Sequence, residues 1–225
     1  MNILILSADT KQIESNSYPV CLTEIEGLPL LQHIVNSIMP LKPKNVIFAF
    51  HEFYINQFHL DIVAKQLINT ASVISLDQPT QGAACTALLA SEFIENNEPL
   101  LIISSNELVK MNLEIVIGEF IKKQYDAGAV IFQSVHPRYS FVRLDENDLI
   151  IEAAEKMPIS NHATAGIYWY AKGIDFTQAV RSMIRKNARV NDMFFICPAF
   201  NEMVLKHSKI GSHKIDSKDY IQFKD

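Results

Sequence analysis

The chain has 225 residues, of which 48% are hydrophobic and 20% charged, a composition that is ordinary for a globular protein with a sizeable core. Its net charge of −5 and its isoelectric point near 5.8 argue against a protein that binds nucleic acid by neutralising phosphates. No uncharged run reaches the roughly 18 residues that a membrane helix needs, and the first residues are typical of a strand rather than a signal peptide.

In the first half of the chain, short apolar runs alternate with amphipathic segments. The apolar runs predict buried strands, and the amphipathic segments predict helices. Strands are expected at 2–7, 45–50, 72–76 and 99–105, and helices from Pro29 to the stop at Pro40 and Pro43 and at 55–69, 83–95 and 113–127. This alternation predicts a parallel sheet with helices on both faces.

Beyond about residue 127 the pattern changes to strands separated by short turns. Strands are expected at 129–135, 139–145, 149–156 and 165–171, followed by helices at about 174–187 and 193–207 and a short strand near 209–216. No linker or internal repeat separates the two halves. We therefore expect a single α/β domain over 1–225, with a mixed, mainly parallel central sheet flanked by helices.

The fold class itself predicts where a ligand binds. In open α/β sheets, ligands lie beyond the carboxyl ends of the strands. Here those positions are 7–19, 77–83, 104–108 and 136–138, with 155–164 placed to close the site from the second half. His136 and Arg138 are residue types that bind an anionic substrate; the alternative is a loop that only turns the chain.

Several segments along nearly the whole chain carry a family pattern. They are NILILS (2–7), PVCLTEIEGLPLLQHIV (19–35), PTQGAACTALLASEFI (79–94), LLIISSNELV (100–109) and the stretches 136–170 and 186–204. In this order the chain resembles the sugar-phosphate nucleotidyltransferases, which share a Rossmann-like nucleotide-binding fold with glycosyltransferases of the GT-A type. The last two stretches resemble a branch tied to capsule and other surface polysaccharides.

The resemblance implies a nucleotide-side half, about 1–127, and a partner-side half, about 128–225. The implied nucleotide contacts are Ser7, Ala8, Gln81, Gly82 and Ala83. The implied contacts to the phosphorylated partner are His136, Arg138, Glu155, Lys156, Thr164, Gly166, Arg189 and Asn191. Two alternatives remain open: Gln81 and Gly82 form only a strand-to-helix turn, or Glu155 and Lys156 form only a surface ion pair of small worth.

The chain departs from the family in the loop that grips the triphosphate. The family has G-x-G-x-R after the first strand and then a lysine, which together bring backbone N–H groups and cations to the phosphates. Here Asp9 and Lys11 replace the two glycines, and Val20 replaces the lysine. Asp9 and Lys11 are candidates for an altered phosphate or metal site; the alternative is a solvated polar loop.

The chain also departs from the family at the magnesium site. The family places an aspartate at the end of its fourth strand, where this chain has Asn106 and Glu107. Asparagine offers a neutral oxygen, which is a poorer ligand for a hard dication. Asp216 is the candidate for the second metal ligand. The alternative is that Asn106 and Glu107 are plain strand-end residues.

Two functions remain in view. The first is an enzyme that joins a nucleoside triphosphate to a sugar phosphate for surface polysaccharide synthesis, with Mg²⁺ as cofactor. The second is a pseudoenzyme that keeps the fold as a binding or regulatory module, as a homo-oligomer or beside an active relative. Under both, the ligands are a nucleotide, a sugar phosphate or both. Cys21, Cys85 and Cys197 are widely spaced, which indicates reduced thiols in a cytoplasmic protein.

Overall fold

The computed structural model describes residues 1–7 and 18–223. One nine-stranded sheet runs through both halves of the chain, in the order β10–β9–β11–β6–β1–β4–β5, with β8 paired to β11 and β12 paired to β8. The strands are β1 (Asn2–Ser7), β4 (Asn45–His51), β5 (Ser72–Leu76), β6 (Leu100–Ser104), β8 (Ala127–Gln133), β9 (Ser140–Leu144), β10 (Ile150–Glu155), β11 (His162–Tyr170) and β12 (Ile210–Lys214).

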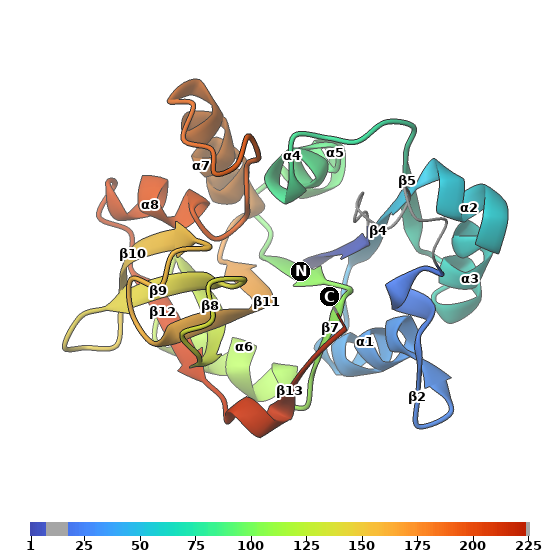
Figure 1. Cartoon of the computed structure of the whole chain (residues 1–225), viewed down its shortest axis with the longest axis horizontal. Helices are drawn as coiled ribbons and strands as arrows, with labels where there is room; N and C mark the ends of the chain where they lie inside the picture. Colours follow the sequence, from blue (N-terminus) through green and yellow to red (C-terminus); the bar gives the residue numbers. More distant parts are fainter. Residues whose placement is uncertain (8–17, 224–225) are drawn as a thin grey trace.

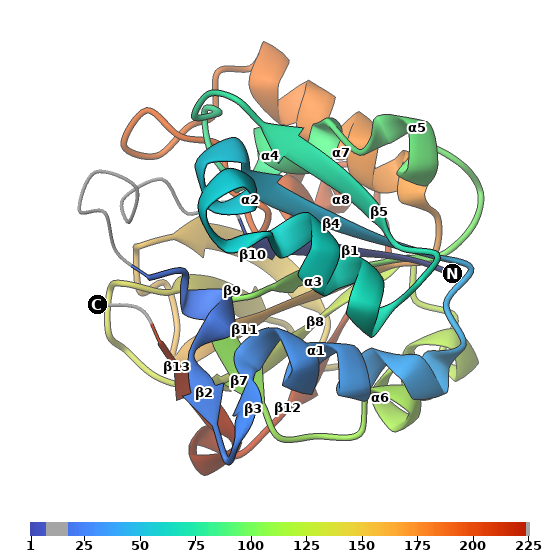
Figure 2. The same cartoon turned by 90° about the vertical axis from the view of Figure 1, so that its right-hand side faces the viewer.

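Strand direction changes between the two halves. β5, β4, β1 and β6 are parallel, whereas β11 is antiparallel to β6 and to β8, and β9 is antiparallel to β10. The prediction of a mixed sheet with a parallel first half is therefore confirmed. Figure 2 shows β5 at the edge of this sheet, with the helices that follow β4 beside it.

Helices cover both faces of the sheet. They are α1 (Leu30–Ile38), α2 (Glu52–Phe58), α3 (Leu60–Leu67), α4 (Ala83–Leu88), α5 (Ser91–Ile94), α6 (Leu113–Lys122), α7 (Gly173–Arg185) and α8 (Ala199–Val204). In Figure 1, α4, α5, α7 and α8 lie above the sheet, and α1 and α6 lie below it. Within the described residues, no helix is both long and apolar enough to cross a bilayer.

The central strand β1 shows why both faces are covered. Ile3 and Ile5 point into the core beneath α1 and α6, while Leu4, between them, points into the core beneath α4 and α7. All three side chains are fully buried. A strand buried on both sides reads as a continuous apolar run, which is why NILILS was recognisable as a strand from the sequence.

Three predicted helices are shorter or broken. The segment 55–69 is interrupted at His59, whose φ of 54° ends α2 and starts α3. The segment 83–95 divides into α4 and α5 around Leu89 and Ala90. The segment 113–127 stops at Lys122, because Gln124 has a φ of 53° and β8 already begins at Ala127.

The predicted helix 193–207 is wrong over its first part. Only Ala199–Val204 is helical, because Pro198 at the N-cap restricts the residue before it to a non-helical conformation. The preceding Phe194 bonds instead to the distant backbone of Gln81 and Ala84, and Met193 forms a local turn with Val190. Two predicted strands are also displaced: β8 starts and ends two residues before 129–135, and β11 begins at His162, three residues before 165–171.

Four short strands were not predicted. β2 (Glu24–Ile25) and β3 (Leu28–Pro29) form a small hairpin ahead of α1, so Pro29 is the residue before that helix rather than its first turn. β7 (Glu107–Val109) pairs with β13 (Tyr220–Gln222) near the end of the chain. Short helical turns occupy Val20–Leu22, Met39–Leu41 and Ser217–Asp219.

The side chain of Asn201 on α8 closes the free edge of β10. Its amide nitrogen donates to the Ala153 carbonyl at 2.7 Å, and its amide oxygen accepts from the Ala153 N–H at 2.8 Å. Among the strands that the structure describes, β10 pairs only with β9, so Asn201 satisfies backbone groups that would otherwise be open to another strand.

We therefore expect Asn201→Ala to lower the free energy of unfolding by about 2 kcal/mol, since two backbone groups lose their partners. Urea unfolding followed by circular dichroism measures this. Asn147→Ala, in an exposed turn, is the matched control and should change stability by less than about 0.5 kcal/mol. Equal stability of the two variants would contradict the role given to Asn201.

Candidate functional site

The candidate site lies at the carboxyl edge of the parallel strands. Ser7 ends β1 and Ser104 ends β6, and the two strands are neighbours. Because β11 is antiparallel to β6 with Ile167 opposite Ile103, the residues just before Ile167 reach the same edge. The pairing therefore brings Gly166 beside the segment that follows β6.

The segment Gln81–Gly82 is bonded to the partner-side half. The Phe194 N–H donates to the Gln81 carbonyl at 2.7 Å, and the Phe194 carbonyl accepts from the Ala84 N–H at 3.0 Å. Gly82 has a φ of 108°, and a Cβ at this position would lie 2.5 Å from the Phe194 oxygen. This close backbone approach and the positive φ account for the glycine, whereas contact of Gln81, Gly82 and Ala83 with a base stays a prediction.

Gly166 leaves room for the carboxylate of Glu107. Its φ is 66°, and a Cβ there would lie 1.8 Å from Glu107 Oε1 and 3.0 Å from the Ser104 Cβ. The same carboxylate accepts a hydrogen bond from the Tyr220 hydroxyl on β13. Burial raises the pKa of Tyr220 well above its ordinary value, and the adjacent Glu107 charge adds to the effect, so the hydroxyl stays protonated and donates.

The side-chain oxygens at the end of β6 already accept hydrogen bonds, so in this arrangement they do not form a magnesium site. The Asn106 amide oxygen accepts from Ser104 Oγ at 2.9 Å, while Glu107 is held by Tyr220. Asp216 caps a short helical turn and pairs with Lys218 at 3.0 Å, which lowers the pKa of its carboxyl. Among the described residues, no three His, Cys, Asp or Glu side chains gather as metal ligands.

Glu155 is a buried carboxylate rather than half of a surface ion pair. It is 7% exposed and accepts a hydrogen bond from the Ser140 hydroxyl. Thr164 lies nearby, with its hydroxyl 2.8 Å from that of Tyr168. Burial raises the pKa of the Cys197 thiol, and the charge of Glu155 raises it further. The burial of Glu155 does not fit the alternative of a surface ion pair with Lys156.

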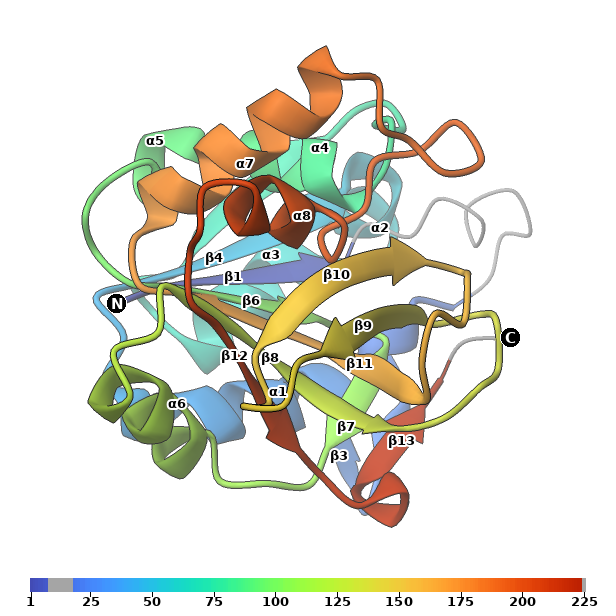
Figure 3. The same cartoon turned by 90° about the vertical axis from the view of Figure 1, so that its left-hand side faces the viewer.

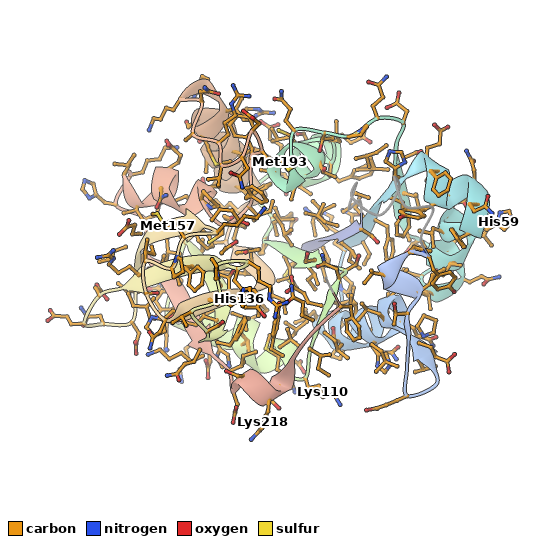
Figure 4. All side chains as sticks on the ribbon, in the orientation of Figure 1. His59, Lys110, His136, Met157, Met193 and Lys218 are labelled. Atoms are coloured by element: carbon orange, nitrogen blue, oxygen red, sulfur yellow. The ribbon has the colours of Figure 1, made fainter. Side chains whose placement is uncertain are left out.

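Two cations of the partner side lie over aromatic rings. The Lys156 ammonium is 5.1 Å from the centroid of the Phe195 ring, and the Arg138 guanidinium carbon is 5.1 Å from that of Tyr139. Lys156 has a φ of 55°, which turns the chain sharply after β10. His136 lies edge-on to Tyr139, with ring centroids 6.2 Å apart. Figure 4 labels His136 and Met157, both of which lie over the strands of this half.

The remaining predicted partner contacts lie in the turn between α7 and α8. Arg189 is 3.7 Å from Asp192, and Asn191 is exposed with a φ of 49°. The isolated bridge between Val190 and Met193 closes this turn. Since Phe194 bonds to Gln81, the turn is attached to the nucleotide-side half.

Some site residues fall outside these observations or were missed. Ala8, Asp9 and Lys11 lie outside the described residues. Tyr220 and Phe195 were not identified from the sequence, because their importance comes from contacts with Glu107 and Lys156 rather than from a motif. Tyr139 directly follows the predicted residues His136 and Arg138, yet only its packing reveals a role.

Comparison with known proteins gives a family match and a shared fold. The sequence matches the family described as Nucleotidyl transferase over residues 15–213. No curated protein matches. A nucleoside-diphosphate-sugar pyrophosphorylase from Vibrio cholerae is similar in structure, with a TM-score of 0.80 and 21% identity over 99% of this chain and 95% of its own.

Two further solved structures are similar. One is a candidate glucose-1-phosphate thymidylyltransferase from Bacillus anthracis in complex with a sucrose, with a TM-score of 0.72 and 19% identity over 95% of this chain and 86% of its own. The other is a UDP-glucose pyrophosphorylase complexed with UDP-glucose, with a TM-score of 0.73 and 16% identity over 96% and 90%. At these identities the likenesses establish the fold.

The contact between Gly166 and Glu107 generates a prediction on stability. Gly166→Ala should lower the free energy of unfolding by about 1–3 kcal/mol, because an alanine is strained at this φ and its Cβ overlaps the Glu107 carboxylate. Thermal and urea unfolding measure the loss.

Gly118→Ala supplies the opposite control. Gly118 lies inside α6, and a Cβ there would meet nothing within 4 Å. The alanine should therefore raise stability by about 0.5–1 kcal/mol through helix propensity. Two glycine substitutions with the same sign would contradict this account of Gly166.

Proposed function

This chain belongs to the nucleotidyl transferase family, and we propose that it binds a sugar phosphate or nucleotide sugar at the carboxyl edge of its sheet without carrying out magnesium-dependent transfer. The family match supports the ligand class. The side chains at this edge support binding of the ligand without transfer of a nucleotidyl group.

The observation that carries the binding function is the position of Lys156. Its ammonium lies over the Phe195 ring and forms no ion pair with any described carboxylate. An aromatic face attracts a cation without occupying its N–H donors. The lysine is thus held in place while its donors stay available for a phosphate.

Binding without transfer is supported by the residues that follow β6. Asn106 and Glu107 are engaged by Ser104 and Tyr220, so neither offers a free oxygen pair to a dication. Without charge neutralisation at the phosphates, the departure of pyrophosphate loses its main stabilisation. The competing proposal is an active enzyme whose phosphate and metal contacts come from Asp9 and Lys11.

The wider role that we propose is in surface polysaccharide synthesis, as the partner-side segments suggest. A protein that binds a nucleotide sugar without making it would act in the cytoplasm, beside an active relative or as a homo-oligomer. The hydrogen bond between Gln81 and Phe194 joins the two halves. Through it, ligand binding to one half would change the conformation of the other.

The test measures binding and transfer separately. Calorimetry with glucose 1-phosphate and UDP-glucose should give binding that does not depend on Mg²⁺. Lys156→Gln should weaken both by about tenfold, the effect of losing one charge-assisted hydrogen bond. Lys65→Gln, on α3, is the control and should leave both affinities unchanged.

Pyrophosphate release is the second measurement. With the common nucleoside triphosphates, a panel of sugar 1-phosphates and Mg²⁺, it should stay at the level of a protein-free blank. Release that depends on Mg²⁺ and is lost in Asp9→Ala would establish the enzyme instead. Absence of any binding by the sugar phosphates and nucleotide sugars would contradict the proposed function altogether.

A further inference from the structure

We propose that the ligand of the partner-side rim carries a second anionic group besides its 1-phosphate, and that Arg138 binds it. This inference rests on the proposed function, because it names the class of sugar phosphate that the same edge takes. The rim consists of the loop 134–139 between β8 and β9 and the loop 156–161 between β10 and β11. Figure 3 shows both loops at the same side of the sheet, toward the C-terminal end.

Arg138 stands apart from the other described arginines. The sequence has five arginines, and four of them bond to a neighbouring side chain within this protein. These pairs are Arg143 with Glu152, Arg181 with Glu95, Arg185 with Ser182, and Arg189 with Asp192. In the part of the chain that the structure describes, the Arg138 guanidinium has only the Tyr139 ring beneath it.

The ring that carries Arg138 is itself fixed. Tyr139 is edge-on to Phe132, with ring centroids 5.1 Å apart, and edge-on to Tyr220 at 5.8 Å. Phe132 and Tyr220 stack on one another at 4.1 Å. Tyr220 is in turn tied to Glu107 by its hydroxyl. The platform is therefore built from three separate elements and holds the arginine at a defined place.

Arg138 and Lys156 belong to one surface. The Lys156 N–H donates to the Tyr139 carbonyl at 2.9 Å, and the Ser134 N–H donates to the Asn161 carbonyl at 3.1 Å, so the two loops are bonded at both ends. His136 adds a third basic group: its Nδ1 accepts from the backbone N–H of Arg138 at 3.3 Å, which leaves Nε2 free to donate to a ligand.

The charge of this rim is opposite to that of the chain. The loops 134–139 and 156–161 contain no aspartate or glutamate, although the whole chain has 25 acidic and 20 basic residues. The nearby Glu155 carboxylate is buried and bonded to Ser140. The Lys156 ammonium is enough to bind a 1-phosphate. The Arg138 guanidinium, whose N–H donors bond to no described side chain, is therefore available for a second planar or tetrahedral anion.

The two sources of a second anion are a carboxylate and a second phosphate. The probes are therefore glucose 1-phosphate, glucuronic acid 1-phosphate and glucose 1,6-bisphosphate, titrated calorimetrically into the full chain. At least one of the doubly acidic sugars should bind about tenfold more tightly than glucose 1-phosphate, as expected for one added charge-assisted contact. The preferred probe identifies the anion.

Variants of Arg138 separate this inference from the proposed function. Arg138→Gln should remove the preference, so that the three probes bind this variant with affinities within about twofold of one another. Arg138→Lys keeps the charge without the fork and should retain only part of the preference. Arg143→Gln, which breaks an exposed pair on β9, is the matched control and should bind all three probes normally.

The outcomes are distinct. Equal binding of all three probes, or a preference that survives Arg138→Gln, overturns the inference while the proposed function stands. No binding of any probe by the unmodified protein overturns the inference, and it overturns the proposed function as well if UDP-glucose also fails to bind. Circular dichroism melting of each variant checks that the fold is kept, since Arg138 is exposed and its loss should not shift the midpoint.

Discussion

The antiparallel pairing of β11 with β6 brings described candidate residues from both halves of the chain to one edge of the sheet. β6 is the last of four parallel strands, and a fifth parallel strand would have placed its carboxyl end at the same edge. Instead β11 runs the other way, with Ile167 opposite Ile103, so the beginning of β11 meets the end of β6. The nucleotide-side and partner-side residues therefore share one edge of one sheet, although about sixty residues separate them along the chain.

Two glycines show how tightly this edge is assembled. At Gly166 a carboxylate lies where a side chain would begin, and at Gly82 the backbone of Phe194 does so. Both positions have a positive φ, which suits glycine. The sequence contains only seven glycines, and these two join segments of the nucleotide-side half to segments of the partner-side half. Glycine is absent from residues 8–18, which follow β1 in the sequence, but present where the two halves meet.

The sequence was informative where burial alone decides structure. β1, β4 and β6 read as apolar runs because both of their faces are covered, and the predicted strands there agree with the observed ones. Prediction failed where a distant contact decides: Phe194 is apolar enough for a helix, yet its backbone pairs with Gln81. Pro198 did carry a usable signal, since a helix rarely includes the residue before a proline. No comparable signal marked the break at His59.

The candidate site residues show the same contrast between local sequence signals and distant contacts. Motif position identified Lys156, Glu155 and Arg138, but their states depend on rings and hydroxyls supplied from elsewhere: Phe195, Ser140 and Tyr139. In a chain with net negative charge, surface carboxylates are available to pair with exposed cations, although each such pair adds little stability. On this rim aromatic rings hold both cations instead, and the loops that carry them contain no acid. A ring orients a cation without neutralising it, so the arrangement keeps positive charge ready for an anion that arrives from solution.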